Sequence, residues 1–181
     1  MKIRLSEFLA VNFMVMCVLS STCGYSLSGR GTFIPDYIQT IGVPVFENGT
    51  TFFDVEQLLT DRVRSEFIGR GNYRIVPQAD SVDAVVDGTI RSIRITPASF
   101  TDDLQASRYT FTLRASISFR DLTTDEVLWA NPNLVFTEEY DVATGGDALD
   151  PSTFFGQDSN ALTRITEDFA EAVVSAILEA F

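Results

Sequence analysis

The sequence has no histidine, and its single lysine is Lys2, beside the start of the chain. These absences exclude several kinds of catalysis: Ser-His-Asp and Cys-His mechanisms, histidine-ligated zinc, Schiff-base chemistry and a phosphate-binding loop with its lysine. Carboxylate chemistry stays open. However, Glu138 and Glu139 are adjacent on an expected strand, so their side chains point to opposite faces and make a poor acid and base pair. We expect no enzymatic activity, no metal and no organic cofactor.

Cysteine is also scarce, with Cys17 and Cys23 alone. Lys2 and Arg4 precede an apolar run over residues 8–19 that is too short to span a bilayer, and small residues 20–22 lead to Cys23. This pattern predicts a lipoprotein signal peptide over residues 1–22. Cys23 is then the lipid-attachment residue and carries diacylglycerol and an N-acyl chain.

Two positions depart from the usual lipoprotein signal, because Ser20 stands where leucine is common and Thr22 stands where a smaller residue is common. An ordinary signal peptide, an uncleaved anchor and a merely unpaired thiol are the alternatives. Lipidation is favoured, because a lone thiol in an exported protein cannot form an internal disulfide and is a liability unless it is used.

Basic residues are few relative to acidic ones, and the formal net charge of the whole chain is −12. Without residues 1–22 the chain keeps 11 basic and 24 acidic residues, a net charge of −13. Nucleic-acid binding depends on neutralising phosphates, so we expect no nucleic-acid partner. Because the chain is negatively charged, we also expect no bulk electrostatic attraction to an anionic lipid surface.

No second apolar run is long enough for a spanning helix. Residues 23–37 contain turn formers and are expected to be a tether, and residues 38–181 are expected to form one domain. Apolar periodicity predicts strands over residues 39–46, 73–76, 84–95 and 108–120, with a bulge near Arg91 and Ser92. A further strand is expected to begin at 127–129 and resume through 134–140, and helices are expected over 54–68 and 160–181.

Each expected helix has one apolar stripe, and the strand over residues 108–120 has one apolar face. These surfaces must cover one another. We therefore predict an α+β fold: a two-layer sandwich with a mostly antiparallel or mixed sheet of about four to five strands and two helices on one face. The acidic segment over residues 141–158 is interpreted as a solvated loop, since its aspartates do not follow the spacing of an EF-hand calcium site.

Five ordered blocks of the chain resemble the LPS-assembly lipoprotein family LptE. They are residues 23–25 (CGY), 38–50 (IQTIGVPVFENGT), 84–90 (AVVDGTI), 109–121 with 127–129, and 136–140. The resemblance covers nearly the whole chain after the signal. It implies a small α/β lipoprotein without enzymatic activity, anchored at the inner leaflet of the outer membrane on the periplasmic face. It also implies a position inside the LptD β-barrel and a role in delivering lipopolysaccharide to the cell surface.

Arginines on the polar faces of two strands are the candidate contacts for lipopolysaccharide or the barrel. Arg108, Arg114 and Arg120 alternate with the apolar residues of the strand over 108–120, and Arg91 and Arg94 on the preceding strand are weaker candidates. Barrel interiors are polar, and a guanidinium binds phosphate or carboxylate through two hydrogen bonds. The alternative is that these arginines only solubilise the sheet and pair with nearby carboxylates.

One segment departs from the resemblance. The loop over residues 99–105 carries Asp102 and Asp103, where the family can present basic residues. Direct glycolipid binding is therefore less strongly predicted than the contact with a barrel. A rival resemblance also exists, because residues 43–48 (VPVFEN) are similar to the opening strand of CsgG/LpoB-type lipoprotein domains. That resemblance implies an accessory module for secretion or for a cell-wall synthase.

Overall fold

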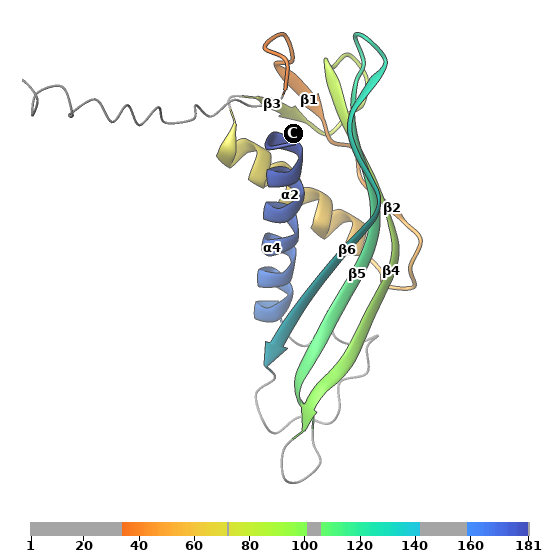
Figure 1. The fold of residues 1–181 in the computed structure, drawn as a ribbon, viewed down its shortest axis with the longest axis vertical. Coiled ribbons are helices and arrows are strands. Elements are labelled where there is room, and N and C mark those ends of the chain that lie inside the picture. The colour runs from red at the N-terminus through yellow and green to blue at the C-terminus, as the bar shows by residue number, and fades with distance from the viewer. Residues whose placement is uncertain (1–33, 72, 101–105, 142–158, 181) are drawn as a thin grey trace, which may run out of the picture. The chain divides into compact units, whose positions relative to one another are not determined.

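Three long antiparallel strands form the main part of the sheet (Figure 1): β4 (Ala84–Phe100), β5 (Ala106–Asp121) and β6 (Glu126–Asp141). The computed structural model describes residues 34–71, 73–100, 106–141 and 159–180. Within these residues, strict alternation in β5 places Phe111, Leu113 and Phe119 on one buried face. The opposite face of β5 carries polar side chains, because successive residues of a strand point to opposite sides.

Three short strands complete a mixed sheet. They are β1 (Thr40–Gly42), β2 (Glu47–Asn48) and β3 (Arg74–Val76), and the order across the sheet is β3-β1-β4-β5-β6. β1 lies between β3 and β4 and is parallel to both. β2 is also parallel to β4 and pairs with it at Thr89 and Ile90, further along the edge that β1 occupies. Two short strands thus share one edge of β4.

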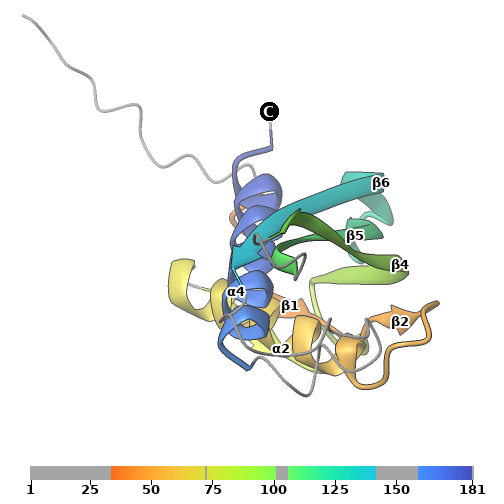
Figure 2. The same ribbon diagram turned by 90° about the horizontal axis from the view of Figure 1, so that it is seen from below.

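Two helices, α2 (Val55–Arg70) and α4 (Ser159–Leu178), lie on the same side of the sheet (Figures 1 and 2). Their buried residues join the apolar face of the long strands in one hydrophobic core. Phe67 of α2 and Phe169 of α4 are fully buried, and the ring of Phe169 meets that of Phe136 of β6 edge-on, with 5.8 Å between the ring centroids. Burial of each such side chain contributes about 1.5–3 kcal/mol.

Ion pairs join the exposed sides of the two helices. Arg62 of α2 pairs with Glu167 of α4 at 3.0 Å, and Arg70 pairs with Glu171 at 2.9 Å and donates to the Ser175 hydroxyl. These groups are partly exposed, so each pair contributes at most about 1 kcal/mol. Among the described residues, neither helix is long and apolar enough to cross a membrane.

The α+β fold predicted from the sequence is confirmed, and so is the bulge, since one extra β4 residue stands between Ile90 and Ser92. The single strand expected over residues 39–46 is wrong. The last backbone bond of this segment to β3 is donated by the Val43 N–H to the Val76 carbonyl, and strand pairing resumes at Glu47. Pro44 between them has no N–H to donate to a neighbouring strand. The strand expected to begin at 127–129 and resume through 134–140 is β6, and a register shift lies between the two parts.

The folded unit also includes residues before the domain boundary expected at residue 38. Ile34 is buried in the core, and the backbone N–H of Ile38 donates to the carbonyl of Pro35 in a turn. The next residues are held by Asp83, whose Oδ2 accepts hydrogen bonds from the backbone N–H groups of Gln39 at 3.0 Å and Thr40 at 2.8 Å. The entry of the chain into the sheet is therefore fixed by side-chain hydrogen bonds as well as by strand pairing.

Candidate functional site

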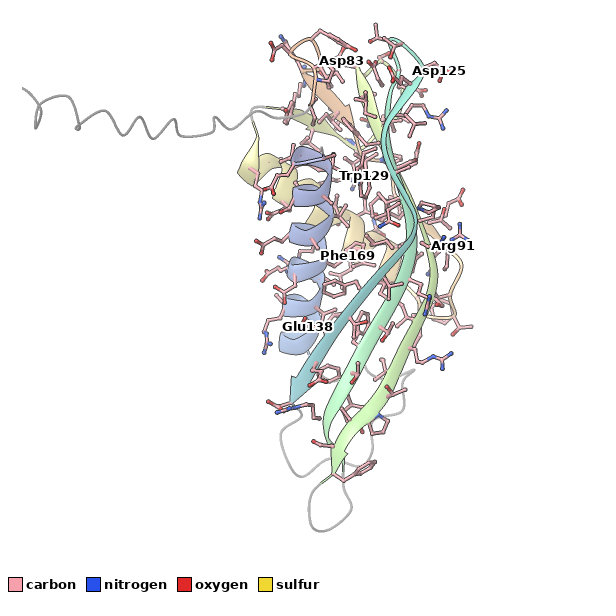
Figure 3. All side chains as sticks on the ribbon, in the orientation of Figure 1. Asp83, Arg91, Asp125, Trp129, Glu138 and Phe169 are labelled. Atoms are coloured by element: carbon pink, nitrogen blue, oxygen red, sulfur yellow. The ribbon has the colours of Figure 1, made fainter. Side chains whose placement is uncertain are left out.

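The outward face of the long strands, on the side away from the helices, holds all five arginines that the sequence singles out. Arg108, Arg114 and Arg120 alternate with buried residues of β5, so they share its outward side. On β4, Arg94 lies opposite Thr112 of β5, which is also on the outward side. Figure 3 shows the labelled Arg91 side chain pointing away from the helices. We call this side of β4, β5 and β6 the outer face.

Three of the arginines gather at the centre of the outer face. The bulge places Ser92 opposite Arg114, with Arg91 as the extra residue before it, and Arg94 two residues further along is a diagonal neighbour of Arg114. All three arginine side chains are exposed. Among the described residues, no carboxylate lies within ion-pair distance of any of them, although the chain is strongly acidic. We call Arg91, Arg94 and Arg114 the central arginines.

The other two arginines have carboxylate partners. The Nε of Arg108 lies 2.8 Å from Asp141 Oδ1, and its Nη1 lies 3.7 Å from Glu139. The hydrogen bond to Asp141 raises the pKa of Arg108 above its ordinary value. Arg120 lies 3.7 Å from Asp125 at the β5–β6 turn. The structure therefore separates two groups that the sequence could not distinguish: paired arginines at the ends of β5 and central arginines without carboxylate partners.

Hydroxyl side chains surround the central arginines. The register of the three strands gives the outer face a set of serines and threonines and few apolar side chains. Val135 of β6, which is half exposed, lies opposite Arg114. Such a surface offers hydrogen-bond donors and acceptors together with localised positive charge. The hydroxyl residues are Thr89, Ser92, Thr96, Thr110, Thr112, Ser116, Ser118 and Thr137.

The carboxylates weighed for catalysis lie on different faces. Glu138 is opposite the buried Phe111, and Glu139 is opposite the outward Thr110. Figure 3 places the labelled Glu138 on the helix side of β6. Among the residues that the structure describes, no cluster of three or more acidic or sulfur-containing side chains could hold a metal ion. The predicted lipid-attachment residue Cys23 and the aspartates at 102, 103, 147, 150 and 158 lie outside the described residues.

Residues around the β5–β6 turn were not singled out from the sequence. Asp121 is completely buried and accepts a hydrogen bond from the hydroxyl of Tyr37 and others from the backbone N–H groups of Thr123 and Thr124. Because residues 23–37 were interpreted as a tether, the contact between Tyr37 and Asp121 was not predicted from the sequence. Ile34 and Ile38 on either side of a Pro-Asp turn were the available signal, because two branched apolar residues are unusual in a solvated linker.

Solved structures with a similar fold come from several bacteria. The hypothetical protein CT253 from Chlamydia trachomatis has a TM-score of 0.52 at 8% identity, over 80% of this chain and 99% of its own. Protein XCC0632 from Xanthomonas campestris, of the DUF330 family, has a TM-score of 0.51 at 11% identity, over 78% and 84% of the two chains. At these identities the likeness shows the fold, a small α+β domain with two helices on one face of a mixed sheet.

Two further comparisons bear on the family. No curated protein sequence matches this chain. The sequence profile of the family LptE, described as Lipopolysaccharide-assembly, matches residues 38–177, which is most of the chain. The chain therefore belongs to the LptE family, as the resemblance predicted. It is a lipoprotein of the lipopolysaccharide-assembly type, from a family of non-enzymatic, membrane-associated proteins.

Proposed function

We propose that this protein is anchored to the periplasmic face of the outer membrane through an acylated Cys23 and assists an LptD-type β-barrel in lipopolysaccharide assembly. Membership in the LptE family supports the role in lipopolysaccharide assembly, and the chemistry of the outer face supports the contact with a barrel. Its hydroxyl groups and central arginines form a polar surface on a domain whose apolar groups are largely buried. This surface is the observation on which the proposal rests.

The chemistry of the outer face suits a position inside a barrel. The interior of a large transmembrane barrel is polar and wet, so a domain that plugs it needs a polar face rather than an apolar one. Serine and threonine hydroxyls can donate and accept hydrogen bonds there without the cost of burying a charge. The apolar side of the same sheet is covered by α2 and α4, which leaves the outer face as the sheet's free surface.

The central arginines suit the anionic groups of a glycolipid headgroup. A guanidinium can bind a phosphate or carboxylate with two parallel hydrogen bonds, and such charge-assisted bonds are roughly twice as strong as neutral ones. Arg91, Arg94 and Arg114 have no internal carboxylate to compete for their N–H groups among the described residues. Arg108 would first have to leave Asp141, so it is a weaker contact than its central neighbours.

This role requires no catalysis and no cofactor beyond the acyl and diacylglycerol groups on Cys23. Glu138 and Glu139 lie on opposite faces and cannot act together on one bond. The CsgG/LpoB-type alternative rests on one short strand, whereas the family match extends over residues 38–177. We therefore do not pursue the alternative as a second function.

Gentle detergent extraction of outer membranes carrying the tagged full-length protein tests the proposal. Co-purification of a large β-barrel, together with a triacylated mass at Cys23, is the expected result. A secretion component or a cell-wall synthase in place of the barrel would reject the partner. An unmodified Cys23 would reject the lipid anchor, whatever partner is found.

A further inference from the structure

The short strand β2 leaves one edge of β4 only partly covered. β2 pairs with Thr89 and Ile90, and the last bond on this edge is donated by the Gly49 N–H to the Ile90 carbonyl at 2.8 Å. The chain then turns toward α2, and the Asn48 side chain holds the turn by accepting from the Thr50 N–H and donating to the Phe52 carbonyl. β4 continues to Phe100, and no described residue pairs with this edge beyond Ile90.

Beyond Ile90, the backbone groups of β4 at this edge have no strand partner among the described residues. The Ile90 carbonyl points to the edge, and the bulge inserts one residue before the regular pairing with β5 resumes at Ser92. Since alternate residues direct both backbone groups to the same edge, Ile93 and Ile95 turn their N–H and C=O groups away from β5. By the same alternation, the backbone of Pro97 also faces away from β5. Proline is tolerated at this position because a residue at an unpaired edge donates no hydrogen bond to a neighbouring strand.

The opposite edge of the long strands is protected against pairing. β6 contains Pro132 with a register shift beside it, and it carries Glu138 and Glu139. Proline, irregular register and charge are the common means by which proteins prevent unwanted strand addition. The β4 edge also has a bulge at Arg91, a proline at Pro97 and two arginines, but between the bulge and Pro97 it pairs with β5 without a register shift. This stretch, from Ser92 to Thr96, keeps the geometry that an added strand requires.

Charge indicates what kind of strand this edge would accept. The charged residues of β4 beyond Ile90 are Arg91 and Arg94, both exposed and without a carboxylate partner among the described residues. An anionic lipid headgroup could satisfy these guanidinium groups but would leave the backbone groups of Ile93 and Ile95 to water. An extended polypeptide with carboxylates satisfies both.

We propose that the β4 edge from Ser92 to Thr96 is a docking edge, at which an extended acidic segment of the barrel partner adds as a strand in line with β2. This inference rests on the proposed function, since it takes the barrel as the partner. It adds a specific contact: main-chain hydrogen bonds to Ile93 and Ile95, and ion pairs to Arg91 and Arg94. Phe53, between β2 and α2, is 89% exposed.

Photo-crosslinking of the full-length lipoprotein in its own membrane tests the docking edge. The photoreactive residue is introduced in two edge variants, Ser92→p-benzoylphenylalanine and Thr96→p-benzoylphenylalanine. Matched controls are Ser118→p-benzoylphenylalanine on β5 and Thr137→p-benzoylphenylalanine on β6, which lie on the same outer face away from the edge. We expect the edge variants to crosslink to an acidic segment of the barrel protein, identified by mass spectrometry of the joined peptides, at several times the yield of the controls.

The role of charge is tested by adding Arg94→Glu or Arg94→Lys to the Ser92 crosslinking variant. Arg94→Glu should lower the crosslink yield about tenfold, which corresponds to about 1.4 kcal/mol, and Arg94→Lys should largely preserve it. A crosslink to a second copy of this chain or to lipid alone would overturn the docking edge. Co-purification of the barrel without edge crosslinks would also overturn it while leaving the proposed function intact. Absence of the barrel from the preparation would reject the proposed function itself, and with it the assignment of the segment.

Discussion

Tyr37 donates its hydroxyl to the buried carboxylate of Asp121, although 84 residues separate them in the chain. Tyr37 lies just before β1, and Asp121 is the last residue of β5. The contact therefore joins the point where the chain enters the fold to the turn between two long strands. The hydrogen bond thus ties the first described segment of the chain to the end of β5.

This hydrogen bond should make stability depend on pH. It is the largest cause that lowers the pKa of Asp121 below its ordinary value of 3.8, and the largest that raises the pKa of Tyr37 above 10.0. The stability from Asp121 is complete above pH 3.8 and is lost as pH falls through the lower folded pKa; that from Tyr37 is lost as pH rises through its higher folded pKa. We expect Tyr37→Phe to reduce the acid-induced loss of unfolding free energy, measured by urea titration between about pH 5 and about pH 2.

Tyr73→Phe is the matched control for that experiment, because the Tyr73 hydroxyl has no hydrogen-bond partner among the described residues. It should keep the pH dependence of the unaltered protein. If Tyr37→Phe also keeps it, the contact with Asp121 does not contribute to the acid sensitivity.

Removal of the Asp83 carboxylate should destabilise the entry into β1. In Asp83→Ala the backbone N–H groups of Gln39 and Thr40 lose their acceptor, which costs about 1–2 kcal/mol of unfolding free energy. Asp80→Ala changes an exposed carboxylate in the neighbouring turn and should stay within about 0.5 kcal/mol of the parent. Urea denaturation curves measure both. Equal stability of the two variants would show that the backbone of residues 39–40 finds other partners.

Two glycine substitutions should change stability in opposite directions. A Cβ at Gly88 would lie 2.7–2.9 Å from ring atoms of the buried Phe46, so Gly88→Ala should cost about 1–3 kcal/mol. A Cβ at Gly69 in α2 would meet nothing within 4 Å, so Gly69→Ala should gain about 0.5–1 kcal/mol from helix propensity. Thermal unfolding midpoints will rank the variants. A stable Gly88→Ala protein would mean that Phe46 can move within the core.

Charge reversal at the centre of the outer face should weaken function without unfolding the domain. The double variant Arg94→Glu with Arg114→Glu breaks no ion pair among the described residues, so its thermal midpoint should stay within about 2 °C of the parent. Co-purification of the barrel or retention of lipopolysaccharide should fall about tenfold, because two donors to anionic groups become repulsive.

Arg74→Glu provides the control for this double variant. Arg74 is exposed on β3, at the opposite edge of the sheet from β6, so Arg74→Glu reverses one charge, half the change of the double variant, without touching the outer face. Its co-purification and lipopolysaccharide retention should match the parent. Normal export and co-purification in the double variant would reject the central arginines as contacts.

Most of the fold followed from periodicity. Strand β5 and helix α4 each have a long, regular apolar pattern, alternating in the strand and at helical spacing in the helix. Their positions were therefore predicted to within a few residues. The short strands were harder, because β1 and β2 depend on pairing with β4 rather than on their own sequence. The buried position of Asp121 could not be predicted either, since its partner Tyr37 comes from a distant part of the chain.

The sequence by itself determined the class of protein: the absence of histidine and the scarcity of lysine removed most catalytic chemistry, and ordered motifs identified the LptE family. It also placed arginines on the polar side of two strands. Only the tertiary structure decided which of them keep a carboxylate partner and where the sheet has a free edge. Ion pairs and strand edges depend on cross-strand register and on where a neighbouring strand ends, and both are set by contacts between residues far apart in the chain.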